Sequence, residues 1–99
     1  MYRDGSGVTQ NVAIAAKWFK SAANLGRAES QLDIGELYEA GRGIAQDYVQ
    51  AHMWYNLAAA AGVPGAEARR NELATKMTPE QLSEAQKFAS QWRPNNDIK

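Results

Sequence analysis

Two glycine pairs and one histidine are the residues that first invite a chemical interpretation. The loops GSG (Gly5–Gly7) and GRG (Gly41–Gly43) could hold a phosphate, but a dinucleotide-binding fingerprint needs a third glycine and a preceding strand. The second loop instead follows a helical pattern that ends near Tyr38, so both loops are interpreted as structural turns. His52 is the single histidine, and Asn56 occupies the position one turn later where a second metal ligand would lie. We therefore expect His52 at the surface or at a packing edge, and no metal site.

No candidate nucleophile is accompanied by partner residues at a recognisable spacing. The serine motifs of β-lactamase-like enzymes, Ser-x-x-Lys, Lys-Thr-Gly and Ser-Asp-Asn, are absent from the 99 residues, and the chain has no cysteine. A small hydrolase, which is one hypothesis for a chain of this size, would need such a nucleophile. The sequence therefore predicts a protein that is not an enzyme and that has no cofactor and no bound metal.

The charges of the chain balance, with 11 basic and 11 acidic side chains. Proteins that bind nucleic acid or an anionic membrane through their overall charge carry a basic excess, so we expect neither partner. No apolar run is long enough for membrane insertion. These features leave the compartment open between the cytoplasm and export after removal of an upstream signal.

An internal repeat spans most of the first 62 residues. The stretch from Tyr2 to Gly26 aligns without a gap on the stretch from Tyr38 to Gly62, at a constant offset of 36 residues. This offset lies in the period range of helical-pair repeats. The repeated tryptophans Trp18 and Trp54 could be imagined as a base-stacking platform, but their place on repeated apolar stripes predicts core positions.

Local signals divide the chain into five helices. Asn11, Asp47 and Thr78 are suited to cap helix N-termini, and Gln81 completes a capping box with Thr78. Gly26 is suited to end a helix in the left-handed conformation. The helices are expected at residues 12–25, 28–40, 48–61, 66–77 and 79–93.

The two copies of the repeat differ on one helix face. Lys17 and Ser21 of the first copy correspond to Met53 and Leu57 of the second. A face that could be wet in the first copy is therefore apolar in the second, and another element should cover it. We expect the last helix to do so through Phe88 and Trp92, which would make it the terminal cap of the stack.

The repeated pattern resembles the Sel1-like repeat, a relative of the tetratricopeptide repeat. The segment from Tyr2 to Gly26 carries the second half of a preceding unit, and the likeness weakens after residue 65, where Asn71 and Ala74 replace a glycine and a tyrosine of the pattern. The residues that carry the resemblance are Gly26, Ala28, Gln31, Ile34, Gly35, Tyr38, Gly41, Gly43, Ile44, Asp47, Ala51, Trp54, Tyr55, Ala58, Ala59 and Gly62.

This resemblance implies an all-α fold, a right-handed α-α superhelix (solenoid) of antiparallel helix pairs with about five helices. Residues 1–65 would form two repeat units, the first without its first helix. Residues 66–93 would form a degenerate repeat and a C-terminal capping helix, and residues 94–99 a loose tail. The resemblance also implies a bacterial source and a role in binding other proteins or peptides.

The residues that the repeat leaves free are the candidates for binding a partner. In repeats of this type the first helix of each pair lines the concave face, so the polar side of residues 28–40 should form an acidic groove. Its alternative interpretation is an ordinary solvated face. The groove would bind a protein or a basic or amphipathic peptide, which charge complementarity would steer. The candidate residues are Glu29, Leu32, Asp33, Glu36, Glu39, Arg69 and Glu72.

Two functional hypotheses follow from this organisation. The first is a non-catalytic interaction module that binds a protein or peptide on its concave face. The second is a structural segment of a longer repeat array, whose exposed N-terminal edge, the helix that carries Trp18, mediates assembly or self-association.

Overall fold

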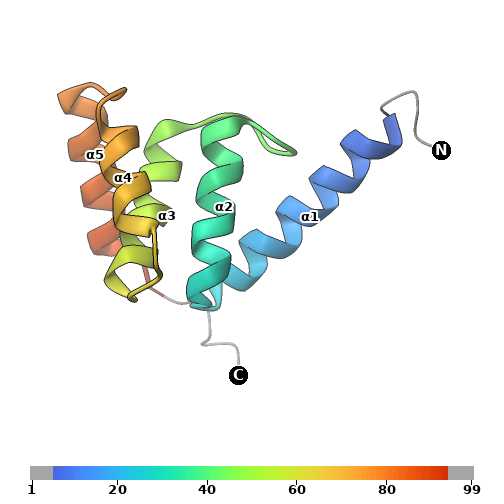
Figure 1. Ribbon diagram of the computed structural model, residues 1–99, viewed down its shortest axis with the longest axis horizontal. Coiled ribbons are helices and arrows are strands. Elements are labelled where there is room, and N and C mark those ends of the chain that lie inside the picture. The colour runs from blue at the N-terminus through green and yellow to red at the C-terminus, as the bar shows by residue number, and fades with distance from the viewer. Residues whose placement is uncertain (1–5, 94–99) are drawn as a thin grey trace.

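The computed structural model describes the backbone of residues 6–93 and the side chains of residues 12–93. This part of the chain contains helices and no strand, which confirms the expected all-α class. Figure 1 shows α2 to α5 packed side by side, with α1 slanting away beyond α2. The helices are α1 (Ser6–Asn24), α2 (Ala28–Ala40), α3 (Tyr48–Ala60), α4 (Ala66–Ala74) and α5 (Pro79–Gln91).

Most helix ends follow the capping signals of the sequence. The Asp47 side chain accepts a hydrogen bond from the amide of Gln50 at the start of α3 (3.1 Å). Thr78 and Gln81 form the expected reciprocal capping box at the start of α5. Gly26 has the positive φ of 94° that a left-handed stop after α1 requires. Local hydrogen-bonding chemistry therefore sets these boundaries.

The start of α1 differs from the expectation. The helix begins at Ser6 and not after Asn11, so Gly7 lies within it and not in a loop. In the second copy, the corresponding loop is tied to α2, where the amide of Asp47 donates to the carbonyl of Tyr38 (3.0 Å). No helix ahead of α1 in the described part of the chain could provide such an acceptor. Gly5 and residues 94–99, the expected loop residue and the expected tail, lie outside the described residues.

α3 is the central helix, because it packs against α2, α4 and α5. The most deeply buried large side chains are Trp54, Tyr55, Ile34 and Leu73. The Trp54 ring meets the Trp92 ring edge-on, with 5.9 Å between the ring centroids and 74° between the planes, an arrangement that aromatic pairs favour. α5 thus packs on α3, with the aromatic residue at its end on Trp54. That it covers Met53 and Leu57, and that it caps an array, stay predictions.

The structure corrects the core position expected for Trp18 and the surface position offered as one possibility for His52. Trp18 is 72% exposed and not part of the core, because α1 packs on α2 and buries Ala16 and Ala23 on a different side. His52 is only 4% exposed and not at the surface. Its Nδ1 has no hydrogen-bond partner. Burial, and then the positive charge of Arg70, lower the pKa of this imidazole.

The close approach of α2 and α3 depends on Gly35, which lies inside α2. A Cβ atom at this position would lie 2.7 Å from two ring carbons of Tyr55 and 3.3 Å from the carbonyl oxygen of Ala51. Tyr55 is fully buried, so its ring has little room to withdraw. Within residues 6–93, no helix combines the length and the apolar composition needed to cross a membrane.

We expect Gly35→Ala to destabilise the fold. Alanine gains about 1 kcal/mol over glycine inside a helix, but overpacking of a closed core typically costs about 1–3 kcal/mol, and here the contacts are to a buried ring and to backbone. The thermal midpoint should therefore fall. Ser83→Ala on the exposed side of α5 is the control, since it gains helix propensity without a new contact. A higher midpoint for Gly35→Ala than for the wild type would contradict the packing argument.

We also expect acid to destabilise the fold through His52. The imidazole has an ordinary pKa of 6.5, which burial lowers in the folded state. Between these two values the unfolded chain binds a proton that the folded chain does not, so stability is lost as the pH falls below about 6.5. Urea titrations between pH 7.5 and pH 5 measure this loss, with His52→Gln as the reference. An equal pH dependence of both proteins would contradict it.

Candidate functional site

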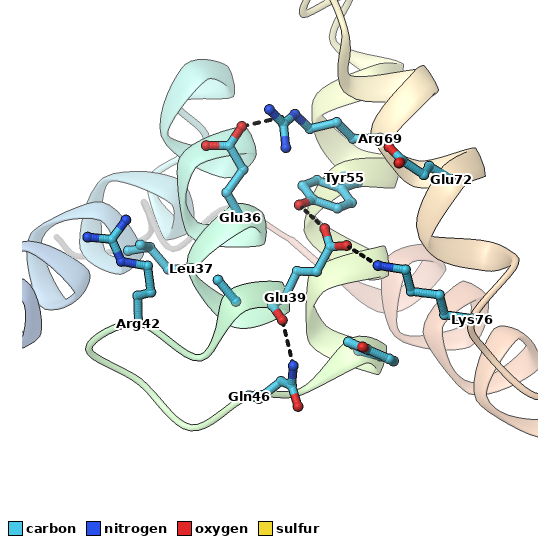
Figure 2. Close-up of a pocket in the computed structure, with 11 residues that line it drawn as sticks. Glu36, Leu37, Glu39, Arg42, Gln46, Tyr55, Arg69, Glu72 and Lys76 are labelled. Atoms are coloured by element: carbon cyan, nitrogen blue, oxygen red, sulfur yellow. Dashed lines mark hydrogen bonds and ion pairs between the residues drawn. The ribbon is translucent and has the colours of Figure 1, made fainter.

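A cavity of about 530 Å³ opens between α2, the start of α3, α4 and the loop that joins α2 to α3. Figure 2 shows Glu36 and Arg69 pointing toward each other, and Tyr55 and Lys76 pointing toward Glu39, while Arg42 and Leu37 extend to the other side of α2. A cavity of this volume is within the range of ligand-binding clefts. It is lined by Glu36, Leu37, Glu39, Ala40, Arg42, Gln46, Tyr48, Tyr55, Arg69, Glu72 and Lys76.

The α2–α3 loop is held against the end of α2 by a small set of hydrogen bonds. Gly41 ends α2 with a φ of 71°, a conformation that favours glycine. The side-chain amide of Gln46 donates to the carbonyl oxygen of Glu39 (2.8 Å). Arg42 and Gln46 of this loop both line the cavity, Gln46 below Glu39 and Arg42 on the other side of α2 (Figure 2).

Glu39 is the centre of the polar network in the cavity. The hydroxyl of Tyr55 donates to Glu39 Oε1 at 2.6 Å, and Lys76 Nζ lies 3.6 Å from Oε2 (Figure 2). Burial raises the pKa of Tyr55, and the hydrogen bond to Glu39 raises it further. The phenol therefore stays protonated and remains a donor, so the network joins α2, α3 and the chain after α4.

A second charged contact crosses the cavity at its upper rim. Arg69 Nε lies 3.0 Å from Glu36 Oε2, and both side chains are partly open to solvent. An exposed pair of this kind contributes about 0–1 kcal/mol, so it can be exchanged for contacts to a partner at little cost. Arg42 and Glu72 form no ion pair within the described residues.

The structure brings together only some of the candidate residues. Glu36, Glu39, Arg69 and Glu72 line the cavity. The other three, Glu29, Leu32 and Asp33, belong to the first two turns of α2 and do not line it. Leu32 packs against the core. The pKa of Asp33 is raised by burial and then by the nearby charge of Glu29.

The expectation of an acidic groove does not hold for the cavity. Three acidic residues line it, Glu36, Glu39 and Glu72, and three basic ones balance them, Arg42, Arg69 and Lys76. Of the three basic residues, only Arg69 was among the candidates. Arg42 and Lys76 were missed because they lie outside the helices, Arg42 in the α2–α3 loop and Lys76 after α4, so that only the fold brings them to the cavity. For Arg42, the glycines at 41 and 43 were the available signal of a tight loop.

The cavity lining holds no histidine, cysteine or serine. Among the residues that the structure describes, no group of three or more His, Cys, Asp or Glu side chains is arranged to hold a metal ion. The arrangement can make hydrogen bonds, ion pairs and apolar contacts to a bound chain.

We expect Tyr55→Phe to lower the unfolding free energy by about 1–2 kcal/mol. The change removes a hydrogen bond to a carboxylate, which typically contributes about 1.5–3 kcal/mol, and the partial exposure of Glu39 lets water replace part of it. Urea unfolding measures the difference. Tyr48→Phe is the matched control, because the Tyr48 hydroxyl makes no hydrogen bond within the described residues. Equal losses for both variants would show that the Tyr55–Glu39 bond is not the cause.

One curated relative shares the pattern of this chain. It is the protein described as chitin synthase regulatory factor 3 of the fission yeast Schizosaccharomyces pombe, which is 41% identical over 66 residues. The match covers 65% of this chain but only 7% of the relative. The bacterial source expected from the repeat stays a prediction, since this relative is a yeast protein.

The family comparison matches the segments that the internal repeat defines. The family model for the Sel1 repeat matches residues 1–26 and 28–63, which are the two copies with the linking helix α2. Sel1 repeats are helical solenoid repeats and generally serve as protein-interaction modules. With more than half of its residues matched, and with the helical architecture described above, the chain belongs to the Sel1 repeat family.

Proposed function

We propose that the chain is a non-catalytic protein-interaction module whose cavity binds a peptide segment of another protein. The observation that carries the proposal is the cavity of about 530 Å³ between α2, α4 and the α2–α3 loop. Most of its lining comes from positions that the repeat pattern leaves free. The glycines, alanines and tryptophan of the pattern pack the helices against one another. The cavity residues outside the pattern are therefore free to contact a partner.

The lining defines the chemistry of the peptide that would fit. Leu37 and Tyr48 offer apolar surface, while Arg42 and Glu72 offer one charge of each sign without an ion-pair partner within the described residues. A purely basic peptide would be repelled by Arg42, Arg69 and Lys76. An amphipathic peptide with an acidic and a basic residue beside an apolar one matches the lining better, because each charge would find a complement.

The yeast relative supports a regulatory or adaptor role of this kind, since its description is that of a regulatory factor. The likeness covers a small part of that protein. It therefore supports a regulatory or adaptor role and does not indicate the partner.

An alternative function, a structural segment that assembles through α1, has one observation in its favour. Trp18 and Ile14 on α1 are exposed, at 72% and 48%, and exposed apolar groups often mark contact surfaces. Sedimentation separates the two functions. An array segment that self-associates would form larger species as its concentration rises, whereas a peptide-binding monomer would not.

Selection of phage-displayed random peptides on the immobilised chain tests the proposed function. We expect enriched peptides of mixed charge, with binding confirmed by calorimetry. The double variant Arg42→Glu with Glu72→Lys keeps the net charge and breaks no ion pair of the described residues. It should weaken binding by about tenfold or more, because both complementary contacts become repulsive.

The double variant Glu84→Lys with Lys87→Glu on α5 is the matched control, since it exchanges the same types of charge away from the cavity. It should bind as the wild type does. Asp33→Lys would show in addition whether the bound peptide continues along α2. A failure to enrich any peptide, or equal binding by the cavity variant and the control, would refute the proposal.

A further inference from the structure

His52 is a buried histidine on α3 that does not line the cavity. Its Nδ1 atom is buried and has no hydrogen-bond partner within the described residues. Most buried polar atoms in folded proteins have such a partner, and a charge that is buried without one costs far more than a neutral group. The environment of His52 therefore accepts the neutral imidazole and penalises the protonated one.

A positive charge on a neighbouring helix adds to this penalty. α3 packs against α2, α4 and α5, and after burial itself the charge of Arg70 on α4 lowers the pKa of His52. Arg70 is held at the contact between α3 and α4. Its Nη1 donates to Asn56 Oδ1 on α3 at 2.9 Å, and Glu67 Oε2 lies 3.7 Å from its Nη2. A proton on His52 would therefore bring a second positive charge to the α3–α4 contact.

No acidic group is placed to pair with a protonated His52. No carboxylate of the described residues lies within ion-pair distance of the imidazole. Glu67 is paired with Arg70, and Tyr48, one turn before His52 on α3, lines the cavity. The remaining charged groups of α2, α4 and α5 lie in the first two turns of α2, in the cavity or on the exposed side of α5. They are Glu29 and Asp33, then Glu36, Glu39, Arg69 and Glu72, and last Glu80, Glu84 and Lys87.

α4 is the element that can yield to this repulsion. It is the shortest of the described helices, with 9 residues, and it buries Ala66 and Leu73. It packs mainly against α3. The ion pairs that join it and the residues after it to α2 are partly exposed, and such pairs contribute little to stability. Short elements with few buried contacts open at a lower free energy than the core. Because Arg69 and Glu72 lie on α4, its release would remove one wall of the cavity.

We propose that a proton on His52 and a peptide in the cavity act on α4 in opposite directions. The proton releases α4 from α3, whereas the peptide holds α4 in place, because Arg69 and Glu72 of this helix line the cavity. The part of the peptide rests on the proposed function, and the part of the proton does not. Two ligands that favour opposite states weaken each other's binding to an equal degree.

The direction of the pH effect follows from the two states of α4. In the released state the imidazole meets water and has its ordinary pKa of 6.5, and in the packed state its pKa is lower. The packed state is therefore fully favoured above pH 6.5 and is progressively destabilised as the pH falls below this value. Between pH 7.5 and pH 5.5, one proton shifts the equilibrium by at most about tenfold.

Amide hydrogen exchange, measured by NMR, tests the release of α4 without a peptide. After correction for the intrinsic pH dependence of exchange, the protection factors of the α4 amides should fall about fivefold to tenfold from pH 7.5 to pH 5.5, and those of α2 should fall less. His52→Gln should abolish this fall, because glutamine stays neutral. Glu84→Gln on the exposed side of α5 is the matched control and should behave as the wild type does. An equal fall in α2 and α4, or a fall that persists in His52→Gln, would overturn the proposal.

Arg70→Gln leaves the histidine in place and removes the opposing charge. The chain has a single histidine, so an NMR titration of its ring protons gives the pKa of His52 directly. We expect this pKa to rise toward 6.5 and the fall in α4 protection to become smaller. An unchanged pKa and an unchanged fall would overturn the proposal, so this variant decides the matter even where His52→Gln does not fold.

A histidine-free peptide selected on the chain tests the coupling to the cavity. At about ten times its Kd it should raise the protection of the α4 amides about tenfold, as mass action requires for a ligand that binds the packed state alone. A bound peptide that leaves this protection unchanged would overturn the proposal, while the proposed function would stand. A chain that binds no peptide would refute the proposed function and the part of the peptide in this inference, and the exchange of the α4 amides would still decide the part of the proton.

Discussion

The contact between the backbone of Gly35 and the ring of Tyr55 is the constraint on which the rest of the structure depends. It allows α2 and α3 to approach so closely that a Cβ atom at Gly35 would overlap the ring. The same approach brings the Tyr55 hydroxyl within 2.6 Å of Glu39. Glu39 then meets Lys76 from beyond α4. A packing contact in the core thus determines how the polar floor of the cavity is arranged.

The repeat separates the residues that build the scaffold from those that can recognise a partner. Trp54 and Ala51 are buried on α3. The packing of the neighbouring helices restricts which residue types fit at these positions. Arg42 and Glu72 lie outside the pattern and line the cavity. Because the scaffold does not depend on such free residues, they can change with the partner while the fold stays the same. This division is what a protein-interaction repeat requires.

The sequence predicted those features that local chemistry controls. The end of α2 at Gly41 and the caps at Asp47 and Thr78 follow from hydrogen bonds within a few residues. The exposure of the Trp18 side chain and the burial of His52 depend on which helices lie beside them, and the repeat pattern alone does not reveal this. The charge balance of the cavity was missed for the same reason, because Lys76 reaches Glu39 only through the fold.

The most direct measurement of the central claim is a set of intermolecular nuclear Overhauser effects between this chain and a peptide selected on it. If the peptide binds in the cavity, we expect contacts to the ring protons of Tyr48 and to the methyl groups of Leu37, and none to Phe88 on α5. Contacts confined to α5, or to the outer face of α1 around Trp18, would contradict the account of the cavity as the peptide-binding site.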